Sequence, residues 1–183
     1  MKKILNVPYY SQYEDVKDEY WKPRACAIVG VKMTLDYFDN HLGLNVEDLI
    51  KEGVSIGGLD ENKDWIHEKL VQLLRNHGMS AYRQEFISLN YEYFDKLLNI
   101  GILKIKKELE KENPILVSVP RKFEKEESFH MIVLTGFETS DSGEVKGFYY
   151  NDTDYHSEAE GKDIFVDIET FKTHWRRLAI FVK

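Results

Sequence analysis

The sequence holds few of the residues that would cross-link the chain, anchor it in a membrane or attach it to nucleic acid. Cysteine occurs once in 183 residues, so no disulfide can form within the chain. No apolar run approaches the roughly 18 residues that a transmembrane helix requires, so no membrane span is expected. Lys and Arg number 25 against 32 Asp and Glu, and the resulting net charge of −7 argues against a nucleic-acid partner.

The chain also lacks features that divide or target a protein. It contains no internal repeat, no low-complexity tract and no long linker, so we expect a single domain over residues 1–183. The opening segment MKKILNVPYYSQ has two apolar residues after its lysines and before Asn6, too few for the core of a signal peptide. We therefore expect a soluble, cytoplasmic protein.

What the sequence does contain is a change of hydrophobic period near residue 114. Apolar residues before this point recur mostly at helical spacing, and those after it mostly alternate as in strands. An extended lead-in at 4–12 and a polar loop come first. The expected helices cover 26–38, 45–53, 64–78, 91–113 with an interruption near Gly101, and 167–177. The expected strands cover 80–87, 114–120, 129–138, 145–152 and 178–183. This order predicts an α+β domain whose N-terminal helical half packs on a mostly antiparallel sheet.

The single cysteine, Cys26, opens an apolar segment instead of lying inside one, in the stretch KPRACAIVGVKMTLDYF. A lone cysteine in such a segment is often a packing residue. In the first turn of a helix, however, unpaired N–H groups and the helix dipole lower the pKa of a thiol, which favours a reactive thiolate. The choice between these interpretations depends on the partners available to Cys26.

A cysteine nucleophile needs a histidine to accept its proton and a third group to orient that histidine. Among the six histidines, His130 alone opens a strongly apolar strand, HMIVLTGF. The others are expected in a loop, on a solvent-facing helix surface or in polar surroundings: His41, His67, His77, His156 and His174. The chain after His130 turns and returns through VKGFYYND, and the geometry of a hairpin brings Asn151 and Asp152 close to His130.

Four motifs in this order resemble the papain-like cysteine peptidases that process bacteriocin (double-glycine) leader peptides, and their stand-alone relatives. The motifs are VPYYSQ, Trp21 with ACAIVGVKM, HMIVLTGF and YYND. The resemblance implies that Cys26 is the nucleophile, His130 the general base and later acid, and Asp152 the residue that orients His130. It also implies that Gln12 donates to the oxyanion beside the N–H of Cys26. A peptide or protein substrate is implied, with no metal or organic cofactor.

The sequence departs from this family pattern at two places. Relatives typically follow the cysteine with a small residue, then Pro and Thr or Ser, whereas Ala27, Ile28 and Val29 follow here. Relatives often have Asn-Asp-Pro where this chain has NDTDY, so Asp154 competes with Asp152 for the third role. The bulkier turn after Cys26 motivates an alternative, a catalytically inactive domain that binds peptides. The same triad would also serve an acyltransferase.

Two further features have competing interpretations. Asp152, Asp154 and His156 would share one face of an extended segment and bind a metal, although a polar loop is the favoured interpretation, so no metal site is expected. Of the three tryptophans, only Trp21 is expected to line a substrate groove, and the others belong to the core or the cleft wall. The cations in WRR at 175–177 suit the C-terminal end of a helix and require no ligand.

Overall fold

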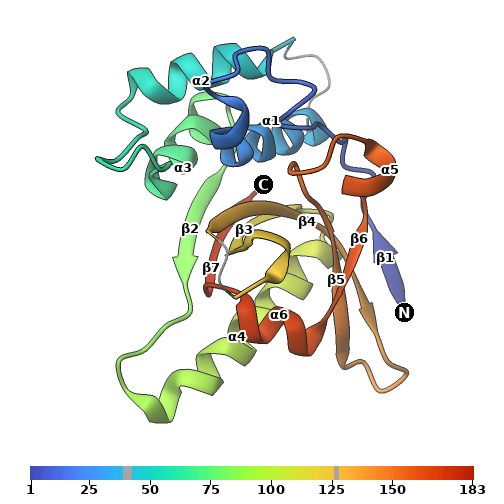
Figure 1. The fold of residues 1–183 in the computed structure, drawn as a ribbon. Helices are drawn as coiled ribbons and strands as arrows, with labels where there is room; N and C mark the ends of the chain where they lie inside the picture. The colour runs from blue at the N-terminus through green and yellow to red at the C-terminus, as the bar shows by residue number, and fades with distance from the viewer. Residues whose placement is uncertain (39–42, 126–127) are drawn as a thin grey trace.

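The computed structural model of the protein describes residues 1–38, 43–125 and 128–183, so the predicted loop position of His41 lies outside the described residues. An antiparallel sheet runs through the molecule, with helices above and below it (Figure 1). Strand order is β2-β7-β3-β4-β5-β6, and β1 pairs with β4. All paired strands are antiparallel, which confirms the predicted α+β class. Within the described residues, no helix is long and apolar enough to cross a membrane.

The strands mostly match the expected segments. Their bounds are β1 Lys2–Ile4, β2 Ala81–Glu85, β3 Ile115–Pro120, β4 Phe129–Thr139, β5 Val145–Asn151, β6 Ile164–Asp167 and β7 Leu178–Val182. Two strands were not expected, namely β1 and β6. Both are short, and neither has the run of alternating apolar residues that identified the others.

The central strands are covered on both faces. All six residues of β3 are buried, as expected for a strand with helices above and below it. Helix α1 (Cys26–Phe38) packs against β3 and β4, and ten of its 13 residues are buried. Its Gly30 allows close approach, because a Cβ there would lie 3.2 Å from Leu116 and 3.4 Å from Val133. The cysteine-bearing end of α1 is therefore held firmly against the sheet.

The remaining helices differ from prediction mainly at their ends. They are α2 Val46–Ser55, α3 His67–Asn76, α4 Phe94–Glu110, α5 Glu158–Gly161 and α6 Ile168–His174. Asn45 caps α2 as expected, accepting from the backbone N–H of Asp48, but Gly53 does not end that helix. The interruption predicted at Gly101 is wrong. A Cβ there would lie 2.7 Å from Trp175 and 2.9 Å from Phe86, so this glycine allows close packing within an unbroken helix.

The extended lead-in is tied down at both of its ends. Lys2, Lys3 and Ile4 pair with β4, and farther along the Tyr10 hydroxyl donates to Asp36 Oδ2 on α1 at 2.7 Å. Asp36 also pairs with Lys32 one helical turn away, and both residues are buried. The Tyr10 hydroxyl thus fixes the lead-in on α1 just before Gln12 through its hydrogen bond to this ion-paired aspartate.

Candidate active site

The Cys26 thiol lies at the first turn of α1, beside His130. The Val29 N–H donates to the Ala25 carbonyl at 2.8 Å, so helical hydrogen bonding begins at the residue before the cysteine. Burial on its own raises the pKa of the thiol, but the charge of His130 and its hydrogen bond to the sulfur outweigh this effect. The backbone N–H groups of Met131 and Ala27 act in the same direction, and the pKa of Cys26 is lowered overall.

His130 connects Cys26 to Asp152. His130 lies on β4 opposite Val119 of β3, and its Nε2 is 2.6 Å from Asp152 Oδ1, with both side chains 2% exposed. Burial on its own lowers the pKa of His130, whereas the Cys26 thiolate and the Asp152 carboxylate raise it to about 10. Since Nε2 faces the carboxylate, Nδ1 is the ring nitrogen left for the thiol. The structure therefore brings Cys26, His130 and Asp152 together.

Asp152 follows β5 and is held by its own backbone as well as by its neighbours. Its N–H donates to the Gly161 carbonyl at 2.8 Å, and its carbonyl accepts from the Tyr9 hydroxyl at 3.1 Å. The N–H of Asp154 donates to Asp152 Oδ1 at 2.9 Å. The carboxylate oxygen that meets His130 is thus already positioned by a backbone donor.

Gln12 is fully buried and fastened to the residue after Asp152. Its backbone N–H donates to the Thr153 carbonyl at 2.9 Å, and its Oε1 accepts from the Thr153 hydroxyl at 2.9 Å. Within the described chain its Nε2 has no partner in good hydrogen-bond geometry, although it lies near the Tyr13 hydroxyl and acts to lower the pKa of that group. A buried amide donor without a well-aligned partner costs about 1–3 kcal/mol unless water or a ligand pairs it, and the oxyanion role of Gln12 stays a prediction.

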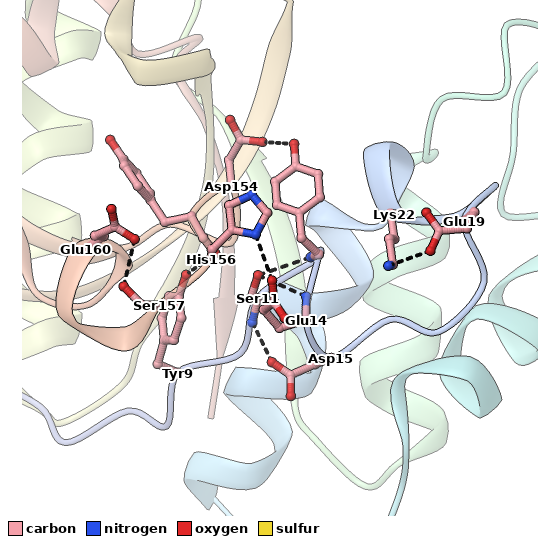
Figure 2. A network of polar contacts seen from close by, with 12 residues as sticks. Tyr9, Ser11, Glu14, Asp15, Glu19, Lys22, Asp154, His156, Ser157 and Glu160 are labelled. Atoms are coloured by element: carbon pink, nitrogen blue, oxygen red, sulfur yellow. Dashed lines mark hydrogen bonds and ion pairs between the residues drawn. The ribbon is translucent and has the colours of Figure 1, made fainter.

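Asp154 and His156 each contact other side chains within the described residues. Asp154 accepts from the Tyr13 hydroxyl at 2.6 Å and lies 3.3 Å from Arg121 Nε, in an ion pair without good hydrogen-bond geometry. His156 Nδ1 is 2.7 Å from Glu14 Oε1. Figure 2 shows the two side chains pointing toward each other. Across residues 1–38, 43–125 and 128–183, no three His, Cys, Asp or Glu side chains gather as metal ligands.

The Peptidase_C39 like family model matches residues 4–179 of the sequence. The chain belongs to this family. No curated protein matches it. The resemblance inferred from VPYYSQ, ACAIVGVKM, HMIVLTGF and YYND is confirmed.

Three solved structures share the fold of this C39-like chain at low sequence identity. A protein described as a C39-like peptidase, from Bacillus anthracis, has a TM-score of 0.65 and 17% identity over 100% of this chain and 98% of that chain. A double glycine motif protease from an AMS/PCAT transporter, in complex with the leader peptide, has a TM-score of 0.58 and 19% identity, over 98% of this chain and 93% of that chain. The third is the peptidase domain of Streptococcus ComA, a bi-functional ABC transporter involved in a quorum sensing pathway. Its TM-score is 0.56 and its sequence identity 15%, over 92% of this chain and 95% of that chain. The predicted papain-like fold is confirmed, and family and fold together support a cysteine peptidase-like hydrolase.

A groove of about 390 Å³ runs past the Cys26 and His130 side chains of this C39-like domain. Trp65, Phe129 and Met131 supply apolar walls. Trp21, the tryptophan expected to line the groove, is not among its lining residues, and its ring lies 5.9 Å from that of Trp65. Trp65 precedes α3 instead of pointing inward from it, since α3 begins at His67. The Trp21 ring therefore contacts the groove wall through Trp65 without lining the groove itself.

Two groove residues were misinterpreted from the sequence. His67 was expected to face solvent, yet it is half-buried and lines the groove. Burial, followed by the charges of Arg176 and Arg83, lowers its pKa. Arg176 was explained as the end of a helix, but α6 ends at His174. Its N–H donates to the Ser118 carbonyl at 3.0 Å, which directs the chain along the groove. No local pattern in the sequence indicates this crossing.

Proposed function

We propose that the protein is a cysteine peptidase that hydrolyses an amide bond through Cys26, His130 and Asp152. The observation that carries the proposal is the buried 2.6 Å contact between His130 and Asp152, next to a thiol whose pKa His130 lowers. A lowered thiol pKa and a raised imidazole pKa favour a thiolate–imidazolium pair, which is the reactive form of such an enzyme. A packing cysteine would need neither partner.

In the first half of the reaction, the Cys26 sulfur attacks the carbonyl carbon of the scissile bond. The carbonyl π electrons move to the oxygen, and the Cys26 N–H with the Gln12 amide stabilises the resulting oxyanion. The C–N bond then breaks, and the His130 imidazolium gives its proton to the leaving amine. The products are a thioester on Cys26 and a free amino terminus.

In the second half, neutral His130 takes a proton from water as the water oxygen attacks the thioester carbonyl. The C–S bond breaks, the acid product leaves, and Cys26 with His130 returns to the thiolate–imidazolium pair. Asp152 keeps the imidazole in one orientation throughout, since its carboxylate contacts Nε2 and leaves Nδ1 for proton transfer.

The substrate is proposed to be a peptide segment lying along the groove. The fold-related double glycine motif protease was solved with a leader peptide bound. Here Trp65 and Phe129 flank the reactive centre in an open groove of about 390 Å³, which suits side chains of a peptide more than a small enclosed ligand. An extended peptide segment is therefore the proposed substrate.

The decisive test is the rate of Cys26 alkylation by iodoacetamide as a function of pH, in the native protein and in His130→Ala. We expect rapid alkylation well below pH 8.5 in the native protein and loss of that low-pH reactivity in the variant. His77→Ala is the matched control, because His77 pairs with Glu52 and does not line the groove.

A thiol that is inert in the folded protein, or unaffected by His130→Ala, would identify Cys26 as a packing residue and would favour an inactive peptide-binding domain. If the thiol is reactive, mass spectrometry of the products separates hydrolysis from acyl transfer. Hydrolysis leaves a free carboxylate on the acyl product, whereas transfer leaves an amide or ester to an added nucleophile.

A further inference from the structure

The groove carries a charge opposite to that of the whole protein. Four cationic side chains line it, namely Arg24, Lys63, Arg121 and Arg176, against one acid, Asp64. The chain as a whole has a net charge of −7. A concentration of one charge next to a reactive centre raises the local concentration of ligands with the opposite charge.

Three of these cations are available to a ligand. Arg24, Lys63 and Arg176 are exposed, and none of them forms an ion pair within the part of the chain that the structure describes. Arg24 donates to the Tyr20 carbonyl at 2.8 Å, and its guanidinium lies 4.5 Å from the centre of the Tyr20 ring. Because no carboxylate of the described chain neutralises these exposed cations, their charge remains available to attract an acidic ligand.

Arg176 is the best placed of the three. Its guanidinium lies 4.1 Å from the centre of the Phe129 ring, and both residues line the groove. Stacking on an aromatic face restricts a guanidinium without occupying its N–H donors. A planar guanidinium held in this way can donate two parallel hydrogen bonds to a carboxylate, at a lower cost in side-chain entropy than a free lysine.

We propose that the groove selects peptides with Asp or Glu side chains close to the scissile bond, and that Arg176 is the main determinant of this selectivity. The inference rests on the proposed peptidase function. The apolar walls, Trp65 and Phe129, would contact the neighbouring side chains of the same peptide. Because the overall charge of the protein repels acidic peptides, a preference for them must come from the groove itself.

The first experiment maps cleavage sites in a whole-proteome tryptic digest by mass spectrometry. We expect Asp and Glu to be enriched within a few residues of the sites cut by the native protein, and depleted there for Arg176→Glu. Lys51→Glu is the matched control, since it changes the charge of the chain equally at an exposed α2 position outside the groove. It should keep the native pattern. Cleavage with no acidic enrichment, or the same loss in both variants, would overturn the proposal.

The second experiment separates this inference from the peptidase proposal. Immobilised Cys26→Ala protein is mixed with three synthetic peptides that differ only by Glu, Gln or Lys at one position. We expect the Glu peptide to bind at least about tenfold more tightly than the Lys peptide, and Arg176→Glu in the same background to reverse this order. Equal binding of the three peptides contradicts the acidic preference even if peptides are cleaved. Selective binding without any cleavage by the native protein contradicts only the peptidase function.

Discussion

The reactive centre and the outer groove lie next to each other and hold their charges in opposite ways. In the centre, Cys26, His130 and Asp152 are joined by charge and hydrogen bonds, and His130 and Asp152 are both buried. In the groove, Arg24 and Arg176 are exposed and rest on aromatic rings. The buried contacts of the centre fix the protonation states of its side chains, whereas the exposed cations of the groove remain able to bind a charged partner.

The buried centre and the exposed groove supply different properties. A buried network acts strongly on its members because little water screens it, so it can move pKa values and hold one geometry. Exposed cations contribute little to the stability of the fold, but they act on anything charged that enters the groove. We therefore expect changes in the centre to alter the chemical step, and changes in the groove to alter which peptide is cut.

Removing the base in the centre should have the largest effect. For His130→Ala, we expect kcat/KM for a cleaved peptide to fall by about 10³–10⁴-fold, because proton transfer and the thiolate are lost together. The measurement is steady-state kinetics, with the thermal unfolding midpoint as a check on folding. A fall of less than about tenfold in a folded variant would contradict the role of His130.

Removing the Gln12 amide should have the next largest effect. For Gln12→Ala, we expect kcat to fall by about 10²–10³-fold, since one donor to the oxyanion disappears. The alkylation rate of Cys26 should change little, because iodoacetamide forms no oxyanion. Gln84→Ala on β2 serves as the control, as Gln84 contacts Lys104 outside the groove. An equal loss in kcat and in the alkylation rate of Cys26 would indicate a structural role for Gln12.

The pH profile should reveal the carboxylate. The reactive pair needs deprotonated Cys26 and protonated His130, so activity is expected between the lowered pKa of the thiol and the His130 pKa of about 10. Asp152 raises the pKa of His130, and Asp152→Asn should therefore move the alkaline limb below pH 10. Above the new pKa, activity falls about tenfold per pH unit. An alkaline limb that stays in place in Asp152→Asn would contradict this assignment.

A change in salt concentration should have the smallest effect on activity. It should affect the exposed groove and leave the buried centre almost unchanged. Raising ionic strength from about 0.01 M to about 1 M shortens the screening length from about 30 Å to about 3 Å. We expect KM for an acidic peptide to rise several-fold, because the groove cations are exposed. The rate of Cys26 alkylation by neutral iodoacetamide should stay nearly constant, because the centre is buried. A thiol as sensitive to salt as KM would remove the distinction.

The elements that carry the centre could be predicted because each depends on local pattern or on one hairpin. The apolar run after Cys26 gave the start of α1 correctly. The hairpin from β4 to β5 brings Asp152 back to His130 despite irregularities in its register near Gly136 and Thr139. Such pairings involve neighbouring strands, and hairpin geometry makes them readable from the sequence.

The parts of the groove formed by Trp65 and Arg176 could not be predicted because these residues come from irregular segments. Trp65 forms an isolated antiparallel β-bridge with Leu59, and Arg176 lies in the link between α6 and β7. Neither segment has a hydrophobic period. The role of Gly101 depends on contacts with Phe86 and Trp175, which tertiary packing alone brings together. The lack of a well-aligned partner for Gln12 Nε2 is likewise a property of the folded surroundings.

The pairing of Gln12 with Thr153 also affects when the site can form during synthesis of the chain. Gln12 and Cys26 leave the ribosome early, whereas His130, Asp152 and Thr153 follow only after the helical half and much of the sheet have been synthesised. A chain arrested before β4 would display its cysteine without a base, an orienting carboxylate or an anchored amide. The nascent protein is therefore expected to stay inert toward itself and its neighbours until the second half of the sheet has folded.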